Sequence, residues 1–163
     1  MQQPGSVLRG FRSLRSLALC LTGLCLMGCG EHITVVPVMQ HDQCGALNAG
    51  MTLIDYGQLA RIRGVTLLDM TQSEPDDAAS LTLVAISKGQ QTTAGFDLSV
   101  MGDAALEEMV VTIPVTWTEP ASEAIVPQTL THPCVIVGLP RGQYTLIRAV
   151  DQYGNEIGRA TTF

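Results

Sequence analysis

The chain is poor in basic residues, and those that it has form no positively charged stripe. Three of its nine lysines and arginines stand in the first fifteen residues, where no acidic residue occurs. From residue 29 onward, six basic residues face 15 acidic ones, which gives a net charge of −9. Because binding of a nucleic acid requires clustered positive charge, we expect no nucleic-acid partner. The acidic clusters at 74–77 and 107–108 are expected to be solvated surface.

The chain also lacks the short motifs of common catalytic chemistry. It contains no Gly-x-Ser-x-Gly, no His-Glu-x-x-His and no phosphate-binding loop. Its histidines, His32, His41 and His132, are far apart in the sequence or stand beside a proline. We therefore expect a protein that is not an enzyme and has no catalytic residue, metal or cofactor. An active site assembled from distant residues is the alternative, because such a site leaves no sequence motif.

The apolar run near the amino terminus is shorter than the roughly 20 residues that span a bilayer. It covers residues 17–27 and follows the arginine-containing segment, which is the pattern of a secretory signal. It ends in Leu26-Met27-Gly28-Cys29. This tetrapeptide resembles the bacterial lipobox, which has a leucine three residues before the cysteine and a small residue directly before it. The resemblance implies acylation of Cys29 and cleavage after Gly28. An ordinary signal peptide with an incidental cysteine is the alternative.

The expected processing divides the chain into three parts: a signal peptide (1–28), a segment with the lipid anchor, a tether and the first strand (29–50), and one β-rich domain (51–163). Two or more acyl chains anchor a protein stably, so we expect a cell-envelope location with the lipid bilayer as a partner. Gly30 and Glu31 differ from the Asp that retains lipoproteins at the inner membrane of enteric bacteria. This difference favours the outer membrane, on its periplasmic or outer side.

Two cysteines, Cys44 and Cys134, remain after processing and lipidation. An even pair in an oxidising compartment indicates a disulfide. It would close a loop of about 90 residues, which the chain-entropy model values at roughly 4 kcal/mol. His41 and His132 stand close to the two cysteines in the sequence, so a Cys2His2 zinc site is the alternative. The cysteines and histidines lack the C-x-x-C spacing that is usual in zinc sites. We therefore predict the disulfide and no metal.

From residue 80 onward the chain has the pattern of a β protein, with short apolar or alternating segments between turn residues. We expect one helix over 52–63, a polar loop over 71–79 and a long loop over 119–131. Pro37 and Pro114 indicate edge strands or bulges. The predicted fold is mainly β, a small antiparallel β-sandwich or partly open barrel with about one short helix. The expected strands are 33–39, 81–87, 96–101, 111–118, 134–139, and a hairpin of 144–150 with 157–163.

Two stretches of this pattern combine glycine, threonine and proline at turn positions. Residues 88–98 read Lys-Gly-Gln-Gln-Thr-Thr-Ala-Gly-Phe-Asp-Leu, and residues 128–140 contain a Thr-His-Pro step into an apolar run. They resemble the carboxy-terminal domain of the PrcB family, bacterial lipoproteins named for a subunit of an extracellular protease complex. Thr92, Ala94 and Phe96 depart from the proline, glycine and tyrosine of the family's hairpin. Glycines at 89 and 95 would permit positive φ at the two ends of a tight turn.

The resemblance implies a non-catalytic protein-binding module, an accessory subunit or modulator of a secreted or envelope protease. We expect residues 89–95 to form a hairpin tip that projects with the loop 119–132 from one end of the domain, because loops on a rigid scaffold are favoured recognition sites. A structural envelope lipoprotein, in which both loops serve geometry alone, is the alternative. The residues expected to contact the partner are Gln90, Gln91, Thr92, Thr93, Phe96, Thr131 and His132.

Overall fold

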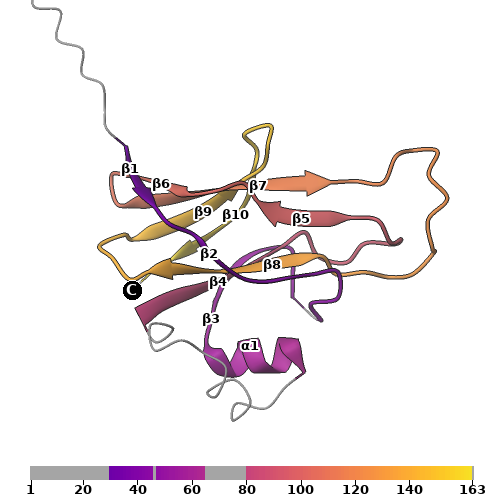
Figure 1. The fold of residues 1–163 in the computed structure, drawn as a ribbon, viewed down its shortest axis with the longest axis horizontal. Helices are drawn as coiled ribbons and strands as arrows, with labels where there is room; N and C mark the ends of the chain where they lie inside the picture. Colours follow the sequence, from indigo (N-terminus) through magenta and orange to yellow (C-terminus); the bar gives the residue numbers. More distant parts are fainter. Residues whose placement is uncertain (1–29, 46, 65–79, 163) are drawn as a thin grey trace, which may run out of the picture.

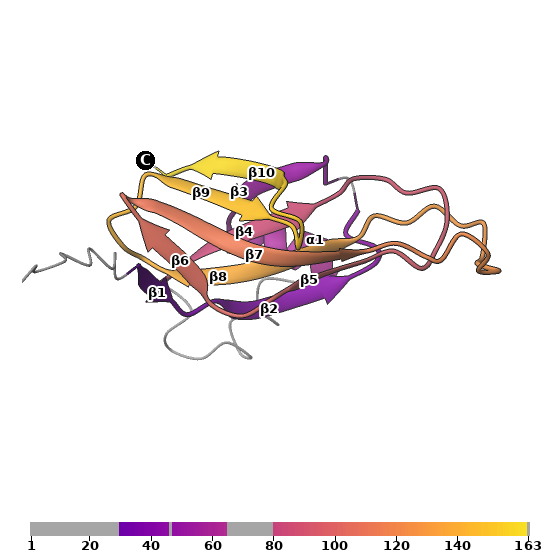
Figure 2. The ribbon, with the colours of Figure 1, turned by 90° about the horizontal axis from the view of Figure 1, so that it is seen from above.

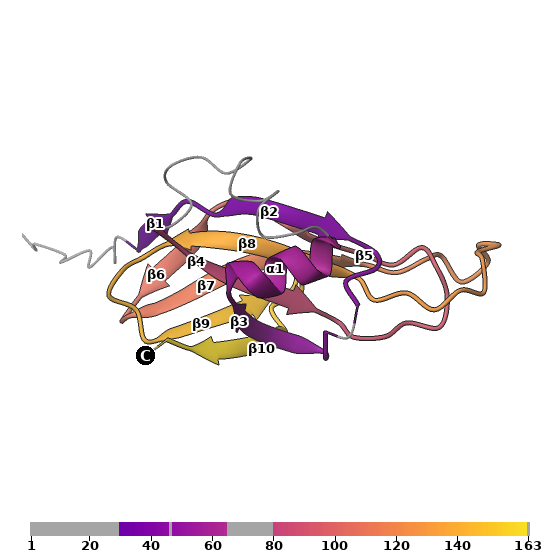
Figure 3. The same ribbon diagram turned by 90° about the horizontal axis from the view of Figure 1, so that it is seen from below.

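Two β-sheets pack face to face, and one helix covers the outer face of the second sheet (Figures 1 and 3). The computed structural model describes residues 30–45, 47–64 and 80–162. The expected signal peptide 1–28, the expected lipidation site Cys29 and the acidic segment 71–79 lie outside the described residues.

The first sheet has six strands in the order β1-β6-β7-β9-β10, with β5 paired to the far half of β7. Its pairings are antiparallel except that of β7 with β9, which is parallel. The last two strands form the predicted hairpin. The strands are β1 (Glu31–Ile33), β5 (Asp97–Val100), β6 (Ala104–Glu107), β7 (Val110–Thr118), β9 (Leu146–Val150) and β10 (Glu156–Thr161).

The second sheet has four antiparallel strands in the order β2-β8-β4-β3. Pro37 lies on β2, an edge strand whose register shifts between Pro37 and Met39, as its proline predicts. The two sheets are not closed into a barrel, so the predicted fold class is confirmed as an open β-sandwich. The strands are β2 (Val36–His41), β3 (Gly50–Ile54), β4 (Leu81–Ser87) and β8 (Cys134–Pro140).

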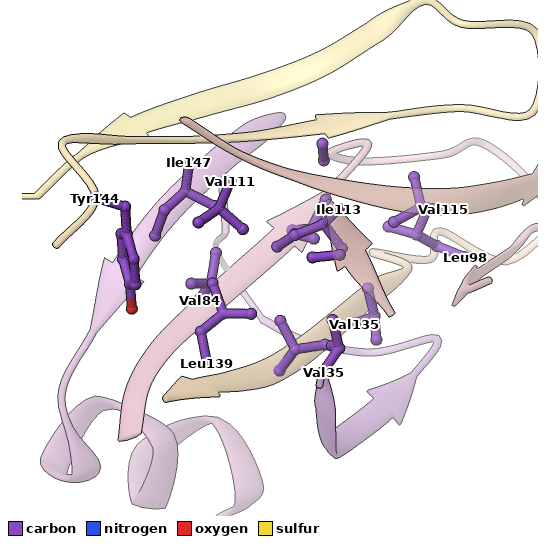
Figure 4. Packing of buried hydrophobic residues seen from close by; sticks show 14 of the residues in the cluster. Val35, Val84, Leu98, Val111, Ile113, Val115, Val135, Leu139, Tyr144 and Ile147 are labelled. Atoms are coloured by element: carbon purple, nitrogen blue, oxygen red, sulfur yellow. The ribbon is translucent and has the colours of Figure 1, made fainter. Parts of the chain in front are cut away.

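The main core lies between the two sheets (Figure 4). In β7, Val111, Ile113 and Val115 are fully buried, and the residues between them are half-buried on the other face. This is the alternation that the sequence predicts. Val84 of β4 and Leu139 of β8 face the same core from the second sheet. Each such aliphatic side chain contributes about 1.5–3 kcal/mol by leaving water.

A smaller core lies between the second sheet and the helix α1 (Tyr56–Arg63). Leu59 and Ala60 of α1 pack against Leu83 of β4 and Ile136 of β8. Because β8 is covered on both faces, its sequence is continuously apolar rather than alternating.

Within the described ranges, no helix has the length and the apolar character needed to cross a membrane.

The helix is shorter than the predicted span of 52–63, because its first residues form β3. The side chain of Asp55 accepts a hydrogen bond from the amide of Gln58 at 2.7 Å, and Gln58 Oε1 accepts one from the amide of Asp55 at 2.9 Å. This capping box fixes the start of the helix at Tyr56. Leu53 fits both the helical and the strand periods, which is why the prediction placed it in the helix.

The expected hairpin at 89–95 is wrong. The strand before it, β4, belongs to the second sheet, and the strand after it, β5, pairs with β7 in the first sheet. The segment therefore crosses from one sheet to the other. Its turn residues have the predicted geometry all the same, since Gly89 and Gly95 have φ values of +76° and +93°.

Pro114 is not on an edge strand, so the first of its two predicted placements, an edge strand or a bulge, is wrong. It lies inside β7, opposite Val150 of β9. On the other side of β7, β6 pairs up to Thr112 and β5 begins to pair at Val115. A proline, which has no amide hydrogen, is tolerated at this change of partner.

Candidate functional site

Two loops project together from the end of the sandwich where β4 and β7 end (Figures 1 and 2). The first, residues 88–96, leads from β4 to β5, and the second, residues 119–133, leads from β7 to β8. We call these two loops together the arm. Their common direction agrees with the expectation that both project from one end of the domain.

Backbone hydrogen bonds join the two loops of the arm. Gln91 and Thr131 form an antiparallel bridge, in which the amide of Gln91 donates to the carbonyl of Thr131 at 2.8 Å and the amide of Thr131 donates back at 3.0 Å. Further along the loops, the amide of Ala94 donates to the carbonyl of Pro127 at 3.0 Å. These bonds satisfy backbone groups that would otherwise need water, and they fix one loop relative to the other.

Gly95 allows the two loops to approach closely. A Cβ atom at this position would lie 3.2 Å from Cβ of Pro120 and 3.3 Å from Cγ1 of Val126. Its φ of +93° is also unfavourable for residues with a side chain. The glycine of the sequence motif therefore serves the packing of the first loop against the second.

Thr131 is buried, with 3% exposure, and this corrects its expected role as a contact residue. Its hydroxyl donates a hydrogen bond to the carbonyl of Thr93 at 2.9 Å. Because the residue is buried and its hydroxyl hydrogen is used inside the arm, this side chain is not presented to a partner. Thr131 instead holds the loops of the arm together.

The predicted disulfide is present at the base of the arm. It joins Cys44 and Cys134 with a Cα–Cα distance of 6.0 Å, inside the usual range of about 4.4–6.8 Å. The amide of Cys44 donates to the carbonyl of His132 at 3.1 Å. Beside it, the side-chain amide of Gln43 donates to the carbonyl of Leu130 at 2.9 Å. The segment after β2 thus secures the second loop both covalently and by hydrogen bonds.

Aromatic packing closes the root of the arm. The ring of Phe96 stacks on that of Trp117 with a centroid distance of 5.3 Å, and the ammonium group of Lys88 lies 5.3 Å from the Trp117 ring. The indole of Trp117 donates to Glu119 at 2.8 Å, and its backbone exchanges two hydrogen bonds with Gln152. Phe96, expected to contact a partner, is half-buried: its ring packs on the scaffold, and part of it stays exposed.

The turn of the β9–β10 hairpin lies close to this root. One oxygen of Asp151 accepts hydrogen bonds from the amides of Tyr153 and Asn155 at 2.9 and 2.8 Å. Desolvation of the carboxylate acts to raise the pKa of Asp151. The hydrogen bonds from Asn155 and Tyr153 and the positive charge of Lys88 outweigh it, so the pKa of Asp151 is lowered from its ordinary value.

The other predicted contact residues divide into exposed and internal groups. Gln90 and Thr92 are exposed, whereas Gln91, Thr93 and His132 are half-buried. The side chain of Gln91 donates to carbonyls of its own loop at 3.3 and 3.4 Å. All these residues therefore lie on the arm. Of this group, Gln90 and Thr92 are the two whose side chains are exposed and can contact a partner.

A comparison with family models identifies the segment that carries this arm. Residues 82–140 match the model described as PrcB C-terminal. The predicted resemblance to the carboxy-terminal domain of PrcB is confirmed over this segment, which runs from β4 to β8 and contains both loops. Searches of curated proteins and of solved structures gave no match.

Apolar residues of the PrcB-like segment were missed by the sequence prediction. Ile125 is fully exposed on the second loop, and Leu130 is 54% exposed. A turn precedes Ile125, since the amide of Ala124 donates to the carbonyl of Ala121 at 2.8 Å. The available signal is the pair of large aliphatic residues Ile125-Val126, in a loop segment between two prolines whose other residues are small or polar. The arm thus offers uncharged hydrogen-bonding groups and aliphatic side chains, a combination that suits contact with a protein.

The histidines near the disulfide do not form the alternative zinc site. His41 Nδ1 accepts a hydrogen bond from the amide of Gln43 at 2.8 Å and lies 3.1 Å from Asp42. Both cysteine sulfurs are used in the disulfide. Over residues 30–45, 47–64 and 80–162, no three or more His, Cys, Asp and Glu side chains are grouped so as to hold a metal ion.

Proposed function

We propose that this chain is a non-catalytic protein-binding module of the cell envelope that acts as an accessory subunit or modulator of a protease. The observation that carries the proposal is the extent of the PrcB C-terminal match, which spans both loops of the arm and the strands that hold them. The family is named for a protease-complex subunit, and this supports a protease as the partner.

The rigidity of the arm supports its role as the contact surface. Side chains ordered before binding lose less conformational entropy when a complex forms. The bridge between Gln91 and Thr131, the bond from Ala94 to Pro127 and the disulfide supply this order in advance. Gln90 and Thr92 carry no charge, so they form hydrogen bonds at a lower desolvation cost than ionic groups would.

We further propose that Cys29 is acylated and anchors the module, with the outer membrane as its location. The support is the sequence Leu26-Met27-Gly28-Cys29 after the arginine-containing apolar signal. Changing Cys29 to serine is expected to leave an unprocessed precursor or to release the protein from the membrane fraction. Incorporation of a labelled fatty acid into the Cys29→Ser variant would contradict acylation at this residue.

The proposed contact is tested by capture of a protease from envelopes of the native host by the full-length, tagged chain. Ile125→Asp places a charge in the exposed apolar position of the arm. Met101→Asp is the matched control, because Met101 is also exposed and lies at the end of β5 that is remote from the arm. We expect wild type and Met101→Asp to retain an endopeptidase that mass spectrometry identifies.

The Ile125→Asp variant is expected to lose about tenfold or more of this capture, because residues that dominate an interface contribute roughly 2 kcal/mol or more. Equal capture by both variants would exclude the arm as the contact surface. Absence of any peptidase from the wild-type sample would exclude the protease partner and favour the structural alternative.

A further inference from the structure

The first strand of the domain begins two residues after the proposed lipid anchor. β1 starts at Glu31 and pairs with β6, so only Gly30 separates Cys29 from the folded sheet. Two residues reach at most about 7 Å. The predicted tether is therefore too short to let the domain move away from the bilayer, and one defined end of the sandwich is held there.

That end includes the turn between β6 and β7. A Cβ atom on Gly30 would lie 3.4 Å from Oε1 of Glu107, which places the amino-terminal segment beside the turn. Met109 at this turn is 54% exposed. Its carbonyl accepts hydrogen bonds from the amides of Thr145 and Leu146 at 2.9 and 3.4 Å, which joins the turn to the loop between β8 and β9.

The turn and this loop form one surface, which we call the anchor-end surface and define as residues 107–109 and 141–145. Met109 and Arg141 line the same hollow, of about 650 Å³. An exposed methionine and an arginine around one hollow suit the boundary of a bilayer, where apolar groups enter and guanidinium groups meet phosphates. Glu108 and Met109 both have left-handed backbone, with φ of 50° and 63°, a conformation that is unfavourable for their side chains.

The side chains around this surface carry charges of both signs. Glu31, Glu107 and Glu108 carry negative charge at this end, and Arg141 and Arg148 carry positive charge. With three negative and two positive side chains, this end has no net attraction to anionic lipid, so the contact depends on the acyl anchor. The orientation is then fixed by the short tether and the apolar tip of the turn rather than by net charge.

We propose that the anchor-end surface rests on phospholipid head groups with Met109 at the membrane boundary, so that the arm is presented away from the bilayer. β1 and the arm lie at opposite ends of the sandwich in all three views (Figures 1, 2 and 3). The nine residues of β7 connect the turn to the arm and span about 30 Å. This inference rests on acylation of Cys29, the anchoring part of the proposed function.

Tryptophan fluorescence in vesicles tests this orientation. Trp117, the chain's one tryptophan, lies at the root of the arm and is an internal reference. The variants Met109→Trp and Ile125→Trp add a second tryptophan at opposite ends. Each acylated protein is purified from membranes and bound to vesicles of three parts phosphatidylethanolamine to one part phosphatidylglycerol. Part of the lipid carries bromine in its acyl chains, which quenches nearby indoles.

We expect the added emission of Met109→Trp to be quenched and shifted to shorter wavelength, whereas wild type and Ile125→Trp keep their full emission. Equal quenching of both variants, or loss of emission at position 125 alone, would overturn the orientation. Flotation of the vesicles separates this result from failure of the anchor. If wild type does not float, the acylation proposal fails and this inference with it.

Discussion

The hydroxyl of Thr131 donates a 2.9 Å hydrogen bond to the carbonyl of Thr93, across two loops that are 38 residues apart in the chain. The same two loops share the backbone bridge between Gln91 and Thr131. Neither loop belongs to a strand pair of its own, so these cross-loop bonds supply the order that a sheet would otherwise give. These bonds join the two loops into one unit, and we expect a change of a single side chain to alter its rigidity.

Replacement of Thr131 by valine keeps the shape of the side chain and removes the bond to Thr93. We expect the arm to open more readily, by about 1 kcal/mol, because one buried hydrogen bond is lost. Hydrogen exchange at the amides of Gln91 and Ala94 should therefore become roughly fivefold faster. Thr129→Val, at an exposed position of the same loop, is the control. Unchanged exchange in Thr131→Val would show that the backbone bonds alone hold the arm.

Removal of the disulfide should destabilise the whole domain. The bond closes a loop of 90 residues and lies between two buried cysteines. We expect the variant with Cys44→Ala and Cys134→Ala to lose about 2–5 kcal/mol of unfolding free energy, measured by urea denaturation. Wild type in the presence of reductant should show the same loss. Two thiols that react with a maleimide in native protein taken from the envelope would contradict the disulfide.

The turn between β6 and β7 should be stabilised by residues that tolerate positive φ. Glu108 and Met109 occupy the two central positions, at φ of 50° and 63°. The double change Glu108→Asn with Met109→Gly supplies the residues that such two-residue turns prefer. We expect a gain of about 1–2 kcal/mol in unfolding free energy. A loss of stability would show that side-chain contacts of Met109 outweigh the backbone strain.

The stability of the β9–β10 hairpin should depend on pH below about 4. The pKa of Asp151 is lowered in the folded chain by hydrogen bonds from Asn155 and Tyr153. A lowered folded pKa means that the charged form stabilises the fold above the unfolded pKa of about 3.9 and that this contribution is lost as pH falls through the folded value.

Urea denaturation of wild type and Asp151→Asn at pH 7, 5 and 3 measures this contribution. We expect wild type to be the more stable at pH 7 and 5 and the difference to shrink at pH 3. Asp103→Asn, on the connection between β5 and β6, is the control for a change of net charge. A difference that is the same at all three pH values would contradict the role of the Asp151 carboxylate.

The strands with strong patterns were predictable from the sequence. The alternation in β7, the unbroken apolar run of β8 and the hairpin around Asp151 each determine local structure through burial on one or both faces. The weak strand β6 (Ala104–Glu107) was missed, because its residues have little preference for strands and its turn contains Glu108 and Met109 rather than glycine or asparagine.

Sheet membership and exposure were beyond the reach of local patterns. Whether residues 88–96 form a hairpin or cross between sheets depends on the partner of β5, which lies almost 20 residues further on in β7. In the same way, the sequence predicts a contact role for Thr131 because the residue stands in a loop that is expected to project from the domain. Its burial arises from the approach of the first loop, which the sequence of the second loop does not reveal.

Photo-crosslinking in the native host tests the central proposal, contact between the arm and a protease, most directly. A benzophenone amino acid replaces Ile125 in the full-length chain. In the control it replaces Met101, which is also an exposed apolar residue. We predict that irradiation of intact cells links the chain to an endopeptidase from position 125 and not from position 101. Two results would contradict the contact between the arm and a protease. One is a crosslink to a peptidase from position 101 alone. The other is the absence of a peptidase crosslink from position 125 while the protein is abundant in the envelope.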